Sequence, residues 1–175
     1  MQHKCRVTVI RTEVYEDLQA KYLKKPKAGP CPFYKVGREF IFERYGGVDD
    51  YMTCGKGDFC SEAWDAISRF IYCAIHGGSI MRNWTNDEKM MIANCSSGTR
   101  PVFFKIERLD YKVLVLDCPL EESHIAPLEA ELKKVGVTDI GYRDWFIECY
   151  VDDDMDDKIL VEAAEKAGLK IKRVD

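Results

Sequence analysis

Hydrophobic and polar residues alternate along several short stretches of the chain, and this period of two predicts β-strands. In the first stretch Cys5 falls on the apolar face, and in a later one Cys149 does the same, so both thiols are expected in a core. The strands predicted in this way cover residues 5–11, 36–45, 101–109, 111–116, 137–140, 141–151 and 169–174.

Apolar residues recur every three or four positions elsewhere, which predicts amphipathic helices. The clearest helix runs from Ser61 to His76, with Ser61 or Asp58 able to cap its start and Gly77-Gly78 following its end. The other predicted helices cover residues 14–23, 120–135 and about 157–167. Residues 84–92 fit a short helix or a loop.

The order of these elements divides the chain into two parts. Residues 1–109 mix strands and helices and predict an α+β domain. Residues 110–175 read strand, helix, strand, strand, helix, strand, which is the ferredoxin-like βαββαβ arrangement. The predicted fold class is therefore α+β, with an N-terminal α+β domain followed by a ferredoxin-like unit.

Composition narrows the function without naming it. The 175 residues carry a formal net charge of -4 with acidic and basic side chains interspersed, which disfavours nucleic-acid binding. No apolar run reaches 18 residues and the first residues lead directly into a strand, so neither a membrane span nor secretion is expected. Eight cysteines in such a chain predict reduced thiols and a cytoplasmic location.

Three of the cysteines, Cys31, Cys60 and Cys95, lie in loops punctuated by glycine or proline at the junctions of predicted elements. Cys60 directly precedes a helix, where unpaired N–H groups and the helix dipole stabilise a thiolate. Three thiolates brought together by folding could hold zinc or an iron–sulfur cluster, with Cys54, His76 or an exogenous group as fourth ligand. The metal-ligand candidates are therefore Cys31, Cys60, Cys95 and Cys54.

Two other interpretations remain open. In the first, Cys60 or Cys95 is a nucleophile that acts on a small anionic or sulfur-containing substrate, and Arg100 or Lys105 holds the anion. In the second, the protein is a non-catalytic interaction module and its thiols are buried structural residues.

The segments LEAELKKVGVTDI at 128–140 and VEAAEKAGLKIKRV at 161–174 resemble heavy-metal-associated domains. That resemblance implies the ferredoxin-like fold. Such domains hold a soft metal ion between two cysteines of a Cys-x-x-Cys loop, whereas the corresponding loop at 117–124 contains only Cys118. Copper carriage is therefore not expected, and the unit is expected to contact a protein partner or to form a homodimer.

The segments GPCPFYKVGREF at 29–40, DFCSEAWDAI at 58–67 and NCSSGTRPVFFKIERL at 94–109 resemble a family of small cysteine-containing repeat proteins of anaerobic bacteria and archaea. The family has no established activity to carry over. The leading hypothesis from the sequence is a small accessory protein that binds a metal ion or an iron–sulfur cluster through its loop cysteines.

Overall fold

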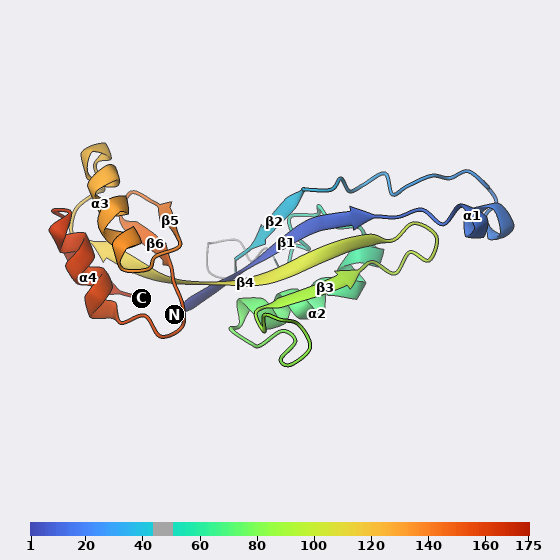
Figure 1. Ribbon diagram of the computed structural model, residues 1–175. Helices are drawn as coiled ribbons and strands as arrows, with labels where there is room; N and C mark the ends of the chain where they lie inside the picture. Colours follow the sequence, from blue (N-terminus) through green and yellow to red (C-terminus); the bar gives the residue numbers. More distant parts are fainter. Residues whose placement is uncertain (44–50) are drawn as a thin grey trace. The chain divides into compact units, whose positions relative to one another are not determined.

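The structure of the chain, a computed structural model, describes residues 1–43 and 51–175 (Figure 1). It contains helices and antiparallel strands, which confirms the α+β class. The chain separates into two compact units, one formed by residues 3–109 and the other by residues 1–2 and 110–175. In the described residues no helix has the length and the apolar character needed to cross a bilayer.

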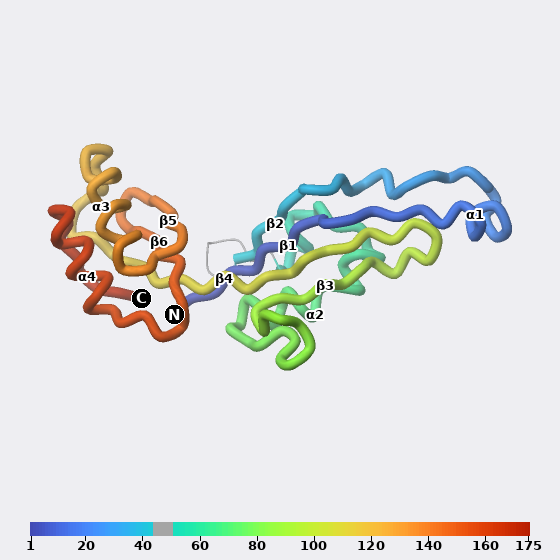
Figure 2. The backbone as a smooth tube through the Cα atoms, in the orientation of Figure 1, coloured from blue at the N-terminus to red at the C-terminus, as the bar shows by residue number. Residues whose placement is uncertain are grey.

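The first unit is an antiparallel sheet packed against one long helix. Its elements are β1 (Gln2–Thr12), α1 (Glu16–Tyr22), β2 (Glu39–Phe42), α2 (Ser61–Ile75), β3 (Met90–Asn94) and the first part of β4 (Val102–Leu116). Strands β2, β1 and β4 lie side by side in that order, and β3 pairs with β4 (Figure 2). The helix α2 forms because its apolar stripe can be buried: Ile67 and Ile71 are fully buried in one core with Val7, Phe42 and Phe104.

Strand β4 corrects the sequence prediction of two strands, 101–109 and 111–116. It is continuous over 15 residues and passes from one unit to the other at Asp110. The charged residues on either side of Leu109, Arg108 and Asp110, are buried in this strand, at 7% and 5% exposed. The Arg108 guanidinium donates to the carbonyls of Gly77 and Gly78, at 2.7 and 3.0 Å, directly after α2. Such long-range hydrogen bonds allow charged residues inside a strand.

Strand β3 is the second difference from the prediction, which left residues 84–92 between a helix and a loop. Residues Met90–Asn94 pair with the part of β4 from Phe103 to Glu107. The strand is only partly buried, so its sequence lacks a strong alternating pattern. Pairing with a distant strand decides its conformation.

The second unit is a four-stranded antiparallel sheet with two helices. After β4 come α3 (Glu122–Lys134), β5 (Asp139–Tyr142), β6 (Phe146–Tyr150), α4 (Asp157–Lys166) and β7 (Ile171–Val174). In the sheet, β4 lies between β7 and β6, and β5 pairs with the other side of β6. The helices bury Leu128, Leu132 and Leu160 against Leu114, Ile147 and Cys149 of the sheet.

Candidate functional site

The three loop cysteines singled out in the sequence line one pocket of the first unit. The pocket has a volume of about 360 Å³. Its lining residues are Cys31, Phe33, Tyr34, Cys60, Ser61, Glu62, Cys95, Ser97 and Arg100. These residues come from three separate parts of the chain, namely the segment before β2, the start of α2 and the turn between β3 and β4.

Cys60 is placed by the start of α2, as the sequence predicted. It occupies the N-cap position with an extended backbone, and its carbonyl accepts the first helical hydrogen bond, from the Trp64 amide at 3.0 Å. Within the described residues its side chain makes no capping hydrogen bond to the helix. The first amide groups of a helix lack intrahelical partners and carry the positive end of its dipole, so the pocket opens beside a group that favours negative charge.

Tyr34 forms the floor beside Cys60. Its ring is 3% exposed and meets the Phe104 ring edge-on with centroids 5.3 Å apart. The Tyr34 hydroxyl accepts a hydrogen bond from the Cys60 amide at 3.0 Å. Burial raises the pKa of Tyr34 above its ordinary value, and negative charge on Cys60 and Cys31 raises it further. The phenol therefore stays protonated and lies within electrostatic reach of both thiols.

Cys95 is held in the turn between β3 and β4. Its amide donates to the Val102 carbonyl at 3.0 Å, and the Val102 amide donates to the Cys95 sulfur at 3.3 Å. Cys95 is 4% exposed, and the neighbouring Ser96 bonds to the Glu62 carbonyl of α2 through its hydroxyl. The turn is therefore closed on itself and tied to the first turn of α2, which brings Arg100 to the same pocket.

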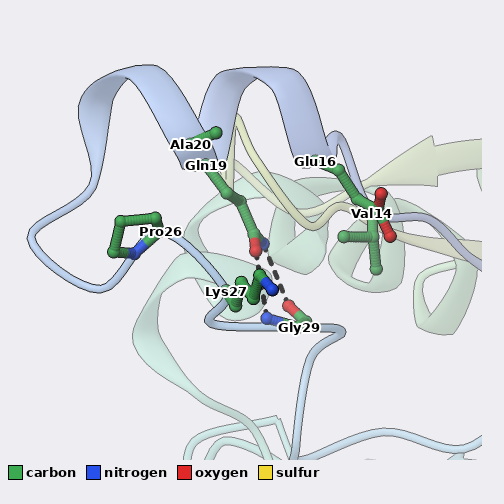
Figure 3. Close-up of a pocket in the computed structure, with 7 residues that line it drawn as sticks. All are labelled: Val14, Glu16, Gln19, Ala20, Pro26, Lys27 and Gly29. Carbon is green, nitrogen blue, oxygen red and sulfur yellow. Dashed lines mark hydrogen bonds between the residues drawn. The ribbon is translucent and has the colours of Figure 1, made fainter.

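Cys31 lies in the irregular segment between α1 and β2. A buried glutamine, Gln19, holds this segment at Gly29, two residues before Cys31. The Gln19 side-chain amide donates to the Gly29 carbonyl at 3.0 Å, and its oxygen accepts from the Gly29 amide at 3.0 Å (Figure 3). The same nitrogen lies 3.4 Å from the Thr99 carbonyl. Gln19 therefore joins the segment that carries Cys31 to the turn that carries Arg100.

A second pocket, of about 480 Å³, lies around this glutamine between α1 and the loop that follows it (Figure 3). Its lining residues are Val14, Glu16, Gln19, Ala20, Pro26, Lys27 and Gly29. Gln19 is already engaged with Gly29, and the pocket contains no thiol. It carries no recognisable chemistry.

Three residues predicted for the site lie elsewhere among the described residues. His76, which follows α2, does not line the pocket, and its Nδ1 lies 2.8 Å from the Tyr72 carbonyl oxygen. Lys105 does not line the pocket and forms an ion pair with Glu107, 2.6 Å from its carboxylate, on the same strand. Cys54 lies in the loop before α2 with a positive φ of 51° and is likewise outside the pocket lining. The sequence did not reveal that these residues lie outside the pocket, because the lining depends on how the chain folds back.

The remaining cysteines have different surroundings. Cys5 and Cys149 are fully buried, as expected, and burial raises the pKa of both thiols, that of Cys149 to about 12. Cys73 lies in α2 with its sulfur 3.6 Å from the Ser79 carbonyl, and Cys118 is exposed. These four positions are spread over both units and do not form a group with the pocket thiols.

The described side chains around the pocket do not form a metal site as they stand. Across residues 1–43 and 51–175, no group of three or more histidine, cysteine, aspartate or glutamate side chains is arranged to hold one. The three pocket thiols share a cavity without forming a closed coordination shell. A metal would therefore require movement of at least one ligand.

Sequence reasoning missed the non-thiol side chains of the pocket: Phe33, Tyr34, Ser61, Glu62 and Ser97. Tyr34 and Phe33 follow Cys31 closely and Glu62 follows Cys60, so proximity along the chain was the available signal. The pairing of Ser97 with these residues depends on the turn geometry.

Comparison with known proteins gives no relative: no protein-family model, no curated protein and no solved structure matches the chain.

Proposed function

We propose that the protein is thiol-dependent and acts on a small anionic substrate in the pocket of Cys31, Cys60 and Cys95. The observation that carries this proposal is the convergence of three thiols and Arg100 on one cavity from three parts of the chain. A cavity of about 360 Å³ accommodates a small molecule rather than a macromolecule.

Cys60 is the proposed nucleophile. It lies at the N-terminus of α2, where unpaired backbone amides favour negative charge, and the thiolate is the form of cysteine that attacks. Cys60 is partly exposed to the cavity, whereas Cys95 is 4% exposed and its sulfur accepts a hydrogen bond. Cys60 therefore combines access with a favourable electrostatic position.

Arg100 and the start of α2 are the proposed anion-binding groups. Arg100 supplies a full positive charge and up to five donors, and the hydroxyls of Ser61 and Ser97 add neutral donors at the same cavity. Glu62 also lines the cavity, and its carboxylate repels a second negative group of the substrate on that side. This arrangement orients one anionic group of the substrate while its reactive atom faces Cys60.

The test is the alkylation rate of Cys60 by iodoacetate compared with neutral iodoacetamide, measured by peptide mapping in a Cys118→Ser background. The substitution removes the exposed thiol. We expect iodoacetate to be favoured at Cys60 by about fivefold more than at a free thiol, since a charge at a helix N-terminus beside an arginine gains about 1 kcal/mol.

Arg100→Gln should remove most of this preference, and Lys105→Gln is the matched control because Lys105 is paired with Glu107 outside the pocket. An unreactive Cys60 in the native protein would contradict the proposal and favour a non-catalytic module with structural thiols. Equal effects of the two substitutions would contradict the role of Arg100.

A soft metal ion or an iron–sulfur cluster is the second candidate, favoured by the three thiols around one cavity. Cys31, Cys60 and Cys95 would supply thiolate ligands, with Cys54 as a more distant fourth. Anaerobically purified protein should then contain zinc or iron, and Cys31→Ser should lower the metal content. Metal-free protein that takes up neither ion would eliminate this candidate.

The second unit is proposed to be ferredoxin-like and to serve as a contact surface for a protein partner or a second copy. Its support is the strand arrangement: β6 lies between β4 and β5, and β4 lies between β6 and β7, so each βαβ element is split by one antiparallel strand. Strand β5 pairs only with β6 in the described ladders, and sheet edges of this kind accept further strands. Reduced thiols throughout fit a cytoplasmic protein.

A further inference from the structure

Cys31 and Cys60 differ from Cys95 in how accessible their sulfurs are and in how they are held. All three line the cavity, but among the hydrogen bonds of the described residues only Cys95 accepts one at its sulfur, from the Val102 amide, within a turn closed by two hydrogen bonds. Cys31 is partly exposed and belongs to a segment without regular structure. The cavity therefore contains one thiol fixed in place and two that are accessible.

Tyr34 connects these two accessible thiols. Its hydroxyl accepts a hydrogen bond from the Cys60 amide, and Tyr34 lines the same cavity as Cys60 and Cys31. Gly29, fixed by Gln19, and the buried ring of Tyr34 bracket Cys31 on its two sides. The segment between these anchors is short, and it places Cys31 in the lining of the same cavity as Cys60.

We propose that the pocket carries out thiol–disulfide exchange with a small anionic disulfide, in which Cys60 attacks the substrate and Cys31 completes the reaction. This inference rests on the proposed function, since it takes Cys60 as the nucleophile and Arg100 as the anion-binding residue. It adds the substrate class and a role for the second thiol.

The proposed exchange proceeds in two steps. The Cys60 thiolate attacks one sulfur of the substrate, a mixed disulfide forms, and the other half leaves as a thiolate that takes a proton from solvent. Cys31 then loses its proton to solvent and attacks the Cys60 sulfur, which releases the second substrate half as a thiol. The protein dithiol is oxidised by two electrons to a Cys31–Cys60 disulfide, and the substrate disulfide is reduced to two thiols.

The anionic class follows from the groups that surround the thiols. Arg100 and the amide end of α2 favour a carboxylate on the substrate, and the described lining contains a single carboxylate, that of Glu62. Oxidised glutathione, which carries carboxylates, is therefore the positive probe. Cystamine, a disulfide that carries ammonium groups, is the matched negative probe.

The experiment treats reduced full-length protein with oxidised glutathione, stops the reaction with acid, and maps the products by mass spectrometry. A Cys54→Ser, Cys118→Ser background removes two thiols outside the pocket. We expect a loss of two hydrogen atoms and a linked pair of peptides that contain Cys31 and Cys60. Cystamine should give this product at least about threefold more slowly, because the local field disfavours its charge.

Single substitutions separate the steps. In Cys31→Ser the reaction should stop at a glutathione adduct on Cys60, and in Cys60→Ser neither the adduct nor the disulfide should form in the pocket. If native Cys60 reacts with iodoacetate but no Cys31–Cys60 link forms, the exchange proposal is overturned and the proposed function stands. If Cys60 reacts with neither reagent, both proposals fail.

Discussion

Replacement of Gln19 by alanine tests how the Cys31 segment is held. Gln19 is 1% exposed and exchanges two hydrogen bonds of 3.0 Å with the backbone of Gly29, with a longer contact of 3.4 Å to Thr99. A neutral hydrogen bond contributes about 1 kcal/mol net, so the two short bonds are worth about 2 kcal/mol of local stability. By this reasoning the opening of the segment becomes about 30-fold more frequent in Gln19→Ala.

The assay is amide hydrogen exchange at Gly29, because its N–H donates directly to Gln19. Exchange should accelerate by at least about 30-fold in Gln19→Ala, whereas Lys21→Ala, an exposed change on the same helix, should leave it within about twofold. Unchanged exchange at Gly29 in the alanine variant would refute the reasoning.

Gln19→Glu separates the donor from the acceptor function of the same side chain. Glutamate keeps an oxygen for the Gly29 amide but places a carboxylate oxygen against the Gly29 carbonyl, where the glutamine donates at 3.0 Å. The ionised form is therefore disfavoured in the folded state, which raises the pKa of the introduced carboxyl. The variant should be closest to wild type in acid and lose stability as the pH rises through about 4 to 6, and an opposite pH trend would contradict the hydrogen-bond assignment.

Two further predictions concern titration. Partial burial opposes ionisation of Glu107, but hydrogen bonds from Lys105 and Arg6 outweigh this effect and lower the pKa of the carboxyl. The ionised carboxylate therefore stabilises the fold fully above its unfolded-state pKa, and this stabilisation is lost as the pH falls through the folded-state pKa. Glu107→Gln should accordingly flatten the acid side of a plot of unfolding free energy against pH, and an unchanged acid side would contradict the ion pairs of Glu107. Because burial raises the pKa of Cys149 to about 12, Cys149 should resist iodoacetamide at about pH 8 until the protein unfolds, while exposed Cys118 reacts at once; similar native rates would contradict this.

Local patterns were sufficient for much of the fold. The apolar stripe from Ala63 to Ile75 and the glycines that follow it predicted α2 to within one residue of its observed end. In contrast, the break expected between residues 109 and 111 is absent, and the buried guanidinium of Arg108 beside it donates to a carbonyl after α2, 30 residues away along the chain. Partners at such separations leave no periodic signal in a sequence.

In the candidate site, too, local patterns predicted some features and distant contacts decided others. Position in loops singled out Cys31, Cys60 and Cys95, and the structure places all three at one cavity with Arg100. Lys105 could not be separated from Arg100 by composition, since both are basic residues near the start of a strand. In the structure Lys105 lies outside the pocket lining and pairs with Glu107, two residues further along the same strand face.

Gln19 could not have been found from the sequence at all. It is a neutral residue on α1, a helix of seven residues, and its type suggests an exposed surface position. Because the Gln19 side chain is buried, leaving its amide unpaired would cost more folding free energy than its hydrogen bonds contribute. Through Gly29 and Thr99 it links the segment that carries Cys31 to the turn that carries Arg100, so one uncharged side chain spans two of the three segments that build the pocket. The cysteines supply the proposed chemistry, and a residue that takes no part in it joins two of the segments that carry the pocket residues.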